Sequence, residues 1–215
     1  EITTGCTHPN ATNYDETANV DDGSCIYPEN GDYSLNFDGE DDYINLGNVG
    51  NYSSSLTVMS WINKGSSSYW DDIIAGQCGD ILFGIYNDKL GLGTQCNYPI
   101  EHNTFSTTSV NDSVWHHVAA TYDANGGTNN LKIYVDGYLE KQSTKYGSFT
   151  PGGLKIGSNY NYYGEFYSGN IDEVAIWNNT LSQEEIQSYM STPPTGSESG
   201  LVGYWKFNAG TDTTL

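Results

Sequence analysis

The sequence predicts an all-β protein, an antiparallel β-sandwich of the jelly-roll type with one short helix near the C-terminus. Short runs in which apolar and polar residues alternate recur along most of the chain. Clusters of Gly, Asn, Asp and Ser separate these runs, and a helical period is almost absent. With 215 residues, the chain is long enough to bury a substantial core.

The predicted strands follow one another at regular intervals, as in sandwich domains. Their expected ranges are 56–62, 73–75, 81–86, 90–94, 105–110, 115–122, 131–135, 154–156 and 171–177. Asn87-Asp88 is expected to form a two-residue hairpin turn, and Asp136-Gly137 ends the strand before it in a turn.

One helix is predicted near the C-terminus. Ser182 and Glu185 form a capping box ahead of Ile186 and Met190, and Pro193-Pro194 ends the helix.

Residues 1–30 differ in composition from the rest, so we expect a Cys-bounded acidic unit there and the sandwich in residues 31–215. The unit resembles small Asp-rich modules found in tandem in bacterial surface and secreted proteins. Asp15, Asp21 and Asp22, followed by a glycine, have the oxygen-rich character of a calcium loop, without the spacing of an EF-hand. A solvated turn cluster is the alternative interpretation.

Four segments share their order with one family of sandwich domains: 36–44, 115–123 with 131–137, 169–177, and 181–186. They resemble the first strand, the paired central strands, the late core strand and the following helix of laminin G-like and pentraxin-like domains. These domains belong to the concanavalin A-like lectin/glucanase superfamily. The resemblance extends over residues 31–207 and implies the fold, whereas a fold alone does not dictate a function.

The C-terminal run 200–207 has two interpretations within this resemblance. A similar run opens the next repeat in laminin G-like arrays, whereas in pentraxins a Trp-containing strand returns to finish the sandwich. Because no such strand precedes Phe37, we expect residues 193–215 to be a linker followed by a closing strand. Its alternation predicts Val202 and Tyr204 on one face, and Leu201 and Trp205 on the other.

The chain carries 27 acidic and 7 basic residues, and its net charge is -20. A surface of this charge repels nucleic acid and anionic membranes, so neither is an expected partner. Solubility in a salty medium accounts for most of this acidity, and a supply of calcium ligands is the further interpretation. No signal peptide or membrane-spanning apolar run is present, so we expect an excised piece of a larger, multi-domain secreted protein.

Four cysteines without zinc-type spacing indicate disulfides and an oxidising compartment. If Asn87-Asp88 is the turn, Tyr86 faces Lys89, and the hairpin places Cys78 within one residue of Cys96. Cys6 and Cys25 then pair by default. In the loop-entropy model, each disulfide stabilises the folded state by on the order of 3 kcal/mol.

No catalytic constellation is recognised, and we expect no enzyme. Sandwich-fold glycoside hydrolases need two carboxylates on one side of a strand, whereas Asp172 and Glu173 are adjacent and are expected to point to opposite faces. His116 and His117 are also adjacent, inside the strongest predicted strand, and structural roles are expected for both.

The resemblance also implies a calcium site. Related sandwiches hold a structural calcium with a late-strand Asp and first-strand groups, which here correspond to Asp172 and Asp38. The alternative is that Asp38 only belongs to a turn and that Asp172 only faces outward.

Pentraxins carry calcium-binding carboxylates in a late loop, where this chain has asparagine and tyrosine instead. We expect these residues to bind a sugar, because flat rings contact pyranose faces and amides bond hydroxyl groups. Strand alternation places the loop of Trp70 and Asp71 at the same end of the sandwich as this late loop, whereas the resemblance to pentraxins would place the turn of residues 77–80 beside it instead. The expected ligand-binding residues are Trp70, Asp71, Asn159, Tyr160, Asn161, Tyr162 and Tyr163.

The sequence therefore predicts a non-catalytic, secreted carbohydrate-binding or adhesion module, stabilised by two disulfides and calcium. Neutral glycans are favoured as partners over anionic ones because of the net charge of -20. A protein-interaction or spacer domain without a sugar site is the second interpretation. A polysaccharide-degrading enzyme domain is the third.

Overall fold

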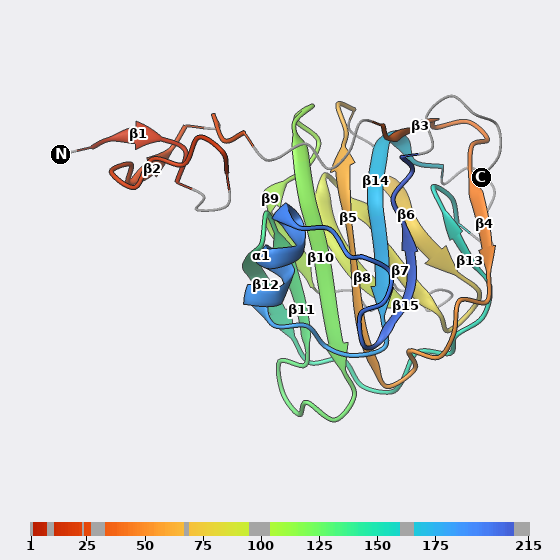
Figure 1. Ribbon diagram of the computed structural model, residues 1–215. Helices are drawn as coiled ribbons and strands as arrows, with labels where there is room; N and C mark the ends of the chain where they lie inside the picture. Colours follow the sequence, from red (N-terminus) through yellow and green to blue (C-terminus); the bar gives the residue numbers. More distant parts are fainter. Residues whose placement is uncertain are drawn as a thin grey trace.

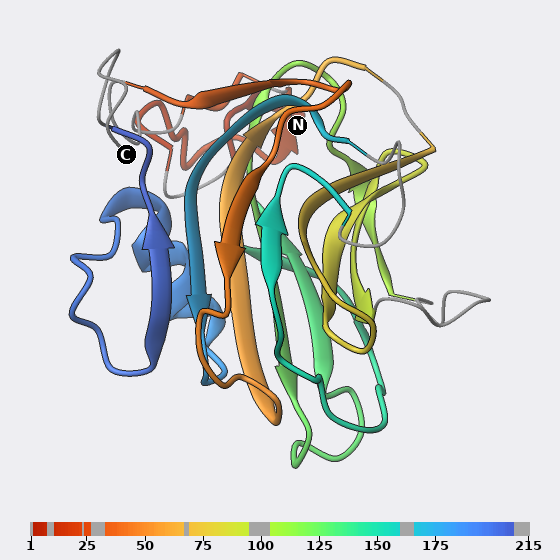
Figure 2. The same ribbon diagram turned by 90° about the vertical axis from the view of Figure 1, so that its right-hand side faces the viewer.

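The computed structural model describes residues 2–7, 11–22, 24–26, 33–66, 69–94, 104–159 and 166–208. Two antiparallel sheets lie face to face around the core, as Figures 1 and 2 show. A small parallel sheet, β1 (Thr4–Gly5) with β2 (Val20–Asp21), forms in the N-terminal segment. The expected all-β sandwich with one helix is confirmed.

Each large sheet combines strands that lie far apart in the sequence. The seven-stranded sheet contains, in spatial order, β12 (Tyr138–Ser143), β11 (Leu131–Val135), β10 (Trp115–Asp123), β5 (Ser55–Asn63), β14 (Ser168–Trp177) and β15 (Leu201–Trp205), with β3 (Leu35–Asp38) also paired to β14. The six-stranded sheet contains β4 (Ile44–Gly47), β13 (Leu154–Ile156), β6 (Trp70–Gly76), β7 (Ile81–Tyr86), β8 (Lys89–Thr94) and β9 (Phe105–Ser109).

The core fills the space between the two sheets. Val58 and Ile62 of β5 and Phe83 and Ile85 of β7 are fully buried there. Burial of each such side chain contributes about 1.5 to 3 kcal/mol relative to exposure. Successive side chains of a strand point to opposite faces, so the alternation of apolar and polar residues in the sequence places these apolar side chains in the core.

The Asn87-Asp88 hairpin has the expected register, and the expected turn at Asp136-Gly137 is present. Tyr86 pairs with Lys89, and the intervening Asn87 and Asp88 adopt φ values of 45° and 67°. Such positive φ values define the tight hairpin turn that suits twisted strands. The β11–β12 hairpin is of the same kind, with positive φ at both Asp136 and Gly137.

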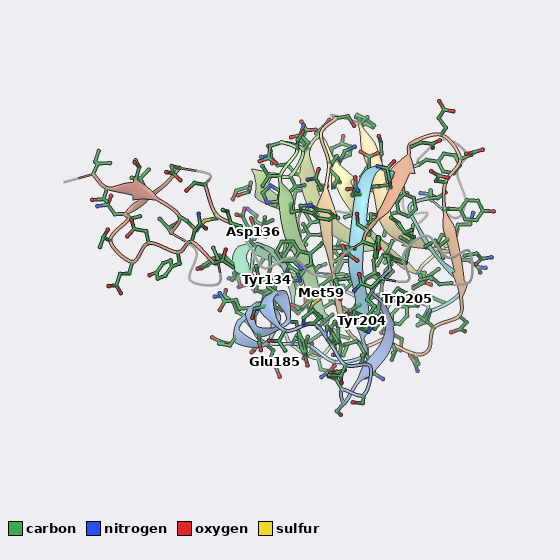
Figure 3. All side chains as sticks on the ribbon, turned by 45° about the horizontal axis from the view of Figure 1, so that its top comes forward. Met59, Tyr134, Asp136, Glu185, Tyr204 and Trp205 are labelled. Carbon is green, nitrogen blue, oxygen red and sulfur yellow. A yellow bond between two sulfur atoms is a disulfide. The ribbon has the colours of Figure 1, made fainter. Side chains whose placement is uncertain are left out.

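The helix α1 (Gln183–Ser191) begins at the expected capping box, in which Ser182 and Glu185 satisfy each other's backbone N–H groups. It covers part of the outer face of the seven-stranded sheet, beside Met59 and Tyr134, which Figure 3 labels. The side chains buried in this second cluster are Met59, Ala119, Tyr134, Ala175, Trp177, Leu181 and Ile186. No helix in the described part of the chain is long and apolar enough to cross a membrane.

Within the sandwich, two strands, β4 and β12, were not among the strands expected from the sequence; in the N-terminal segment, β1 and β2 were not expected either. β12 is largely polar and forms one edge of its sheet. An edge strand of this kind buries few side chains, so its sequence carries little apolar signal. β4 is short and only partly buried, for the same reason.

The edge of β14 is shared by two short strands. β5 pairs with residues 170–177 along one side of β14, while β3 pairs with 168–171 and β15 with 174–177 along the other. The C-terminal strand thus returns to the same sheet as the first strand, and the two lie end to end. The interruption between them falls at residues 172 and 173.

A β-bulge in β14 lies at this interruption. The register with β5 shifts between Asp172 and Ala175, and Glu173 adopts a left-handed φ of 50°. The extra residue of the bulge turns the Glu173 side chain outward, to the same side as Asp172, and not into the core. The Glu173 carboxylate accepts a hydrogen bond from the hydroxyl of Tyr204, which packs with the outer cluster. The expectation that Asp172 and Glu173 face opposite sides is therefore wrong.

A second register shift changes the faces of β15. Trp177 pairs with Leu201, whereas Ile176 pairs with Gly203. As a result, Leu201 packs with the outer cluster and Trp205 packs against the core. The strict alternation predicted for this strand, with both residues on one face, is wrong because the bulge reverses the parity.

The Cys6–Cys25 disulfide is confirmed, with an S–S distance of 2.07 Å. Inside the loop that it closes, the side chain of Asn13 bonds the backbone of Ser24 and Ile26. Cys78 is also disulfide-bonded. Cys96, its expected partner, lies outside the described residues, so this pairing stays a prediction.

Candidate functional site

An aromatic cluster occupies one end of the outer face of the six-stranded sheet. Trp70 and Tyr86 are register partners on β6 and β7, and cross-strand partners project to the same face. Their rings lie 5.2 Å apart. Phe105 stacks on Tyr86 at 5.5 Å, and Tyr69 contacts Tyr86 edge-on at 4.9 Å. We call Tyr69, Trp70, Tyr86 and Phe105 the aromatic cluster.

Two glycines let these rings lie close to the sheet. A Cβ atom on Gly91 would come within 2.7 Å of the Phe105 ring, and one on Gly84 within 2.5 Å of the Asp71 carbonyl oxygen. Any larger residue at either position would displace these neighbours. The aromatic cluster therefore depends on the absence of side chains beneath it.

Hydrogen bonds orient the rings. The indole Nε1 of Trp70 donates to Oδ1 of the fully buried Asp72 at 2.5 Å, and the hydroxyl of Tyr86 donates to that of Tyr69 at 2.8 Å. Tyr69 is 71% exposed, and the other three rings are partly exposed. Partly exposed rings held in fixed positions can bind an apolar ligand surface without a large loss of side-chain entropy.

The other predicted ligand-binding residues are placed differently. Asp71 pairs with the buried Ile85, and its side chain lies in the interior, 2.7 Å from Lys64 Nζ. Burial raises the pKa of Asp71, although Lys64 acts in the opposite direction. Asn159 is also buried. Tyr160, Asn161, Tyr162 and Tyr163 lie outside the described residues.

The sequence did not identify Tyr69, Tyr86 or Phe105 as site residues. A usable signal was present for Tyr86, because the Asn87-Asp88 turn fixes the β7–β8 register. Placing Trp70 opposite Tyr86 also required the register of β6, which has a bulge between Asp72 and Ile74. No local pattern reveals that register.

An acidic cluster follows β3. The carboxylates of Asp38, Asp41 and Asp42 offer oxygen atoms within 4.8 Å of one another. The backbone N–H of Asp38 donates to Asp42 at 3.1 Å, and that of Glu40 to Asp38 at 2.8 Å. Three carboxylates at this spacing match the hard oxygen ligands that Ca²⁺ prefers.

Asp172 does not lie with this cluster. Asp38 pairs with Ser168, four residues from Asp172 along β14, which corresponds to about 13 Å at the rise of a strand. Burial raises the pKa of Asp172 to about 7; the hydrogen bond from the Glu173 backbone N–H lowers it, and the charge of the Glu173 carboxylate adds a smaller upward effect. The structure thus brings Asp38 together with Asp41 and Asp42 and leaves Asp172 beside Glu173 and Tyr204.

The carboxylates of the N-terminal unit make local bonds. Asp15 accepts from the backbone and hydroxyl of Thr17, and these bonds lower the pKa of Asp15. Asp22 accepts from Ser24, which lowers its pKa in the same way. The side chain of Asp21 lies outside the described residues.

The adjacent histidines have separate surroundings. His116 bridges Asp136 at 2.8 Å and Asp112 at 3.2 Å. Burial alone lowers the pKa of His116, but the two carboxylates together outweigh it, and the net shift is upward. His117 packs edge-on against Trp61, and burial lowers its pKa to about 3. His116 thus contacts two carboxylates and His117 an indole ring, and the structural roles expected for both stay a prediction.

Comparison with known proteins defines the class. Residues 38–187 match the laminin G type 3 family, described as the concanavalin A-like lectin/glucanases superfamily. This match covers more than half of the chain, so the protein belongs to that family, and the resemblance read from the sequence is confirmed.

Two curated relatives contain several kinds of domain by name. The chain is 29% identical over 151 residues to rat sushi, von Willebrand factor type A, EGF and pentraxin domain-containing protein 1, and 28% identical to the mouse protein. The match covers 55% of this chain but only 4% of either relative.

Solved structures share the fold. A putative carbohydrate-binding protein from Bacteroides ovatus has a TM-score of 0.70 at 21% identity, covering 93% of this chain and 60% of that one. The Limulus polyphemus SAP-like pentraxin has a TM-score of 0.58 at 15% identity, with 78% and 86% covered. The Ruminococcus gnavus sialidase module CBM40, bound to α2,3-sialyllactose, has a TM-score of 0.57 at 13% identity, with 74% and 97% covered.

Proposed function

We propose that this chain is a non-catalytic carbohydrate-binding module of a larger secreted protein, and that the aromatic cluster contacts the glycan. The observation that carries the proposal is the group of partly exposed rings of Trp70, Tyr86 and Phe105, with Tyr69 at their margin. They stand on a rigid sheet, so they need little ordering on binding. Structural neighbours that are carbohydrate-binding by name support the proposal.

The chemistry of the cluster suits a sugar. The C–H groups on one face of a pyranose pack against aromatic rings, and the two tyrosine hydroxyls can bond the sugar hydroxyls. The net charge of -20 disfavours polyanionic glycans, so neutral chains are the proposed class. Asn159, Tyr160, Asn161, Tyr162 and Tyr163 remain proposed contributors.

Calcium is the proposed stabilising ion. The residues that would hold it are Asp38, Asp41 and Asp42, whose oxygen atoms have the required chemistry and spacing. Calcium would supply positive charge there and fix the loop between β3 and β4. Asp15, Asp21 and Asp22 remain a second proposed site, in the N-terminal unit of residues 1–30. Asp172 lies apart from Asp38 along β14 and is not among the residues proposed to hold the ion.

The aromatic proposal is tested by glycan binding of single variants. Trp70→Ala and Tyr86→Ala are each expected to weaken binding of an oligosaccharide found on a glycan array by about 1 to 3 kcal/mol, the range for an anchoring ring. Tyr146→Ala is the matched control, because Tyr146 is 87% exposed and makes no contact with the cluster rings. Unchanged affinity in both cluster variants would contradict the proposal.

The second interpretation is a protein-interaction domain, and the same glycan array distinguishes it from a carbohydrate-binding module. It gains some support from relatives whose names describe multi-domain proteins. Absence of binding to any neutral or acidic glycan, with and without a calcium chelator, would favour it over sugar recognition.

A further inference from the structure

An ion pair lies inside the sandwich, next to the aromatic cluster but directed away from it. Lys64 Nζ is 2.7 Å from Asp71 Oδ2, and the two side chains are 0% and 2% exposed. Lys64 directly follows β5 of the seven-stranded sheet, and Asp71 belongs to β6 of the six-stranded sheet. The pair therefore joins the two layers of the sandwich.

The surroundings of the pair are enclosed. Lys64 Nζ lies 5.5 Å from the centre of the Tyr167 ring, which is itself fully buried. The ammonium also donates to the Ser168 carbonyl at 3.2 Å and to the Ser66 hydroxyl at 3.3 Å. These contacts hold the nitrogen in one position against the Asp71 carboxyl group.

Burial of this kind changes the balance between an ion pair and an amide. In water, hydration of the two charges favours a separate ammonium and carboxylate over the amide. Inside a protein that hydration is lost, and a buried ion pair recovers only part of its cost. Condensation removes both charges and releases one water molecule. Two groups held in contact also react far faster than free ones.

We propose that Lys64 and Asp71 condense spontaneously in the folded protein to form an intramolecular isopeptide bond. A proton first passes from the ammonium to the carboxylate, which leaves a neutral amine and a carboxylic acid. The Nζ lone pair then attacks Cγ of Asp71, the C–N bond forms, the C–OH bond breaks, and water leaves with the second proton of the amine. The step involves no oxidant, reductant or co-reactant.

The electrostatics of the pair support the reactive form. Burial is the largest influence on Asp71 and raises its pKa, and the negative charge of Asp88 on the β7–β8 turn adds a smaller effect. The hydrogen bond and charge of Lys64 and the backbone N–H of Ser168 act in the opposite direction, but the net shift is upward. The net shift favours the protonated carboxyl group, which is the form an amine can attack. The competing outcome is a permanent ion pair, in which the ammonium keeps its three hydrogen bonds.

Intact mass of the folded, reduced wild-type chain separates the two outcomes. The isopeptide makes the chain lighter than its sequence by the mass of one water molecule. Succinimide formation at an Asp-Gly step causes the same loss, and such steps occur at Asp22, Asp38 and Asp136. The position of the loss must therefore be mapped.

Trypsin provides this map, because Lys64 is the first lysine, Lys89 is the second, and the chain has no arginine. An acylated Lys64 is not cleaved, so the expected product is a single dehydrated fragment spanning residues 1–89. Lys64→Arg is the matched control: it keeps the positive charge, but a guanidinium does not form the amide. This variant should have its full mass and be cleaved after position 64.

Full mass of the folded wild type, with release of separate fragments 1–64 and 65–89, would overturn the proposal. A water loss mapped to an Asp-Gly step would also overturn it. The wild-type measurement alone decides the question, so it does not depend on how well a variant folds.

Discussion

At the residue scale, the two neighbouring histidines respond to acid in opposite ways. His116 lies between carboxylates, and its pKa is raised in the folded state. Its contribution to the free energy of unfolding is therefore present below pH 6.5 and is lost as the pH rises through the folded pKa. His117 has no hydrogen-bond partner at Nδ1, and burial lowers its pKa to about 3. Its contribution is present above pH 6.5 and lost as the pH falls toward 3.

Replacement of His117 by phenylalanine tests this assignment. Below pH 6.5 the unfolded wild type binds a proton that folded His117 cannot, so stability should fall by up to about 1.4 kcal/mol per pH unit from this group. The His117→Phe variant should lose less stability between pH 6.5 and 4, measured by urea unfolding at each pH. Parallel curves for both proteins would show that His117 does not resist protonation in the folded state.

At the scale of elements, a second prediction concerns the hydrogen bonds that join β9 of the six-stranded sheet to β12 of the seven-stranded sheet. Glu140 of β12 accepts hydrogen bonds from the backbone N–H groups of Thr107 at 2.7 Å and Thr108 at 2.9 Å, and also from both hydroxyls. Together these bonds lower the pKa of Glu140, although partial burial acts in the opposite direction. The carboxylate thus closes one side of the sandwich where no strand pairing exists.

Glu140→Ala is expected to lower the free energy of unfolding by about 1 to 3 kcal/mol, because it removes charge-assisted bonds to two backbone groups. Glu184→Ala, at an exposed position of α1, is the control and should change it by less than about 0.5 kcal/mol. Because the pKa of Glu140 is lowered, its contribution should be present near neutral pH and fade as the pH falls through the folded pKa. Equal stability of the two variants at pH 7 would contradict this role.

Elements were predictable from the sequence where pattern and turn chemistry agreed. The β7–β8 hairpin followed from the Asn87-Asp88 turn, and α1 followed from its capping box. The faces of β14 and β15 could not be predicted, because each depends on a bulge that one extra residue creates. The left-handed Glu173 has no sequence signature, since the site is occupied by neither glycine nor asparagine.

The candidate site was only partly predictable for a related reason. Trp70 was identified because strand alternation placed its loop at the same end of the sandwich as residues 159–163. Asp71, its neighbour, faces the interior and pairs with Lys64, which strand alternation alone could have indicated once the β6 register was known. Grouping of Tyr86 and Phe105 with Trp70 requires three strand registers at once.

At the scale of the whole molecule, calcium should stabilise the fold if it binds only the folded state. A hundredfold excess over Kd then adds about 2.7 kcal/mol. The Tm gain with calcium should be much smaller in the double variant Asp38→Ala/Asp41→Ala than in the wild type. The variant Asp172→Ala is expected to retain the gain, because Asp172 lies four residues along β14 from Ser168, the residue that pairs with Asp38. An identical Tm gain in the double variant would exclude the loop after β3 as the site.

The shared edge of β14 has a mechanical consequence. β3 begins beside Ile171 and β15 ends beside Val174, so the chain enters and leaves the sandwich at nearly the same point. Tension applied through both flanks would peel these two short strands outward one bond at a time, and the load would not cross the buried core. A tethered domain of this design should yield at low force, yet keep its central strands paired and re-form its edge quickly when the tension is released.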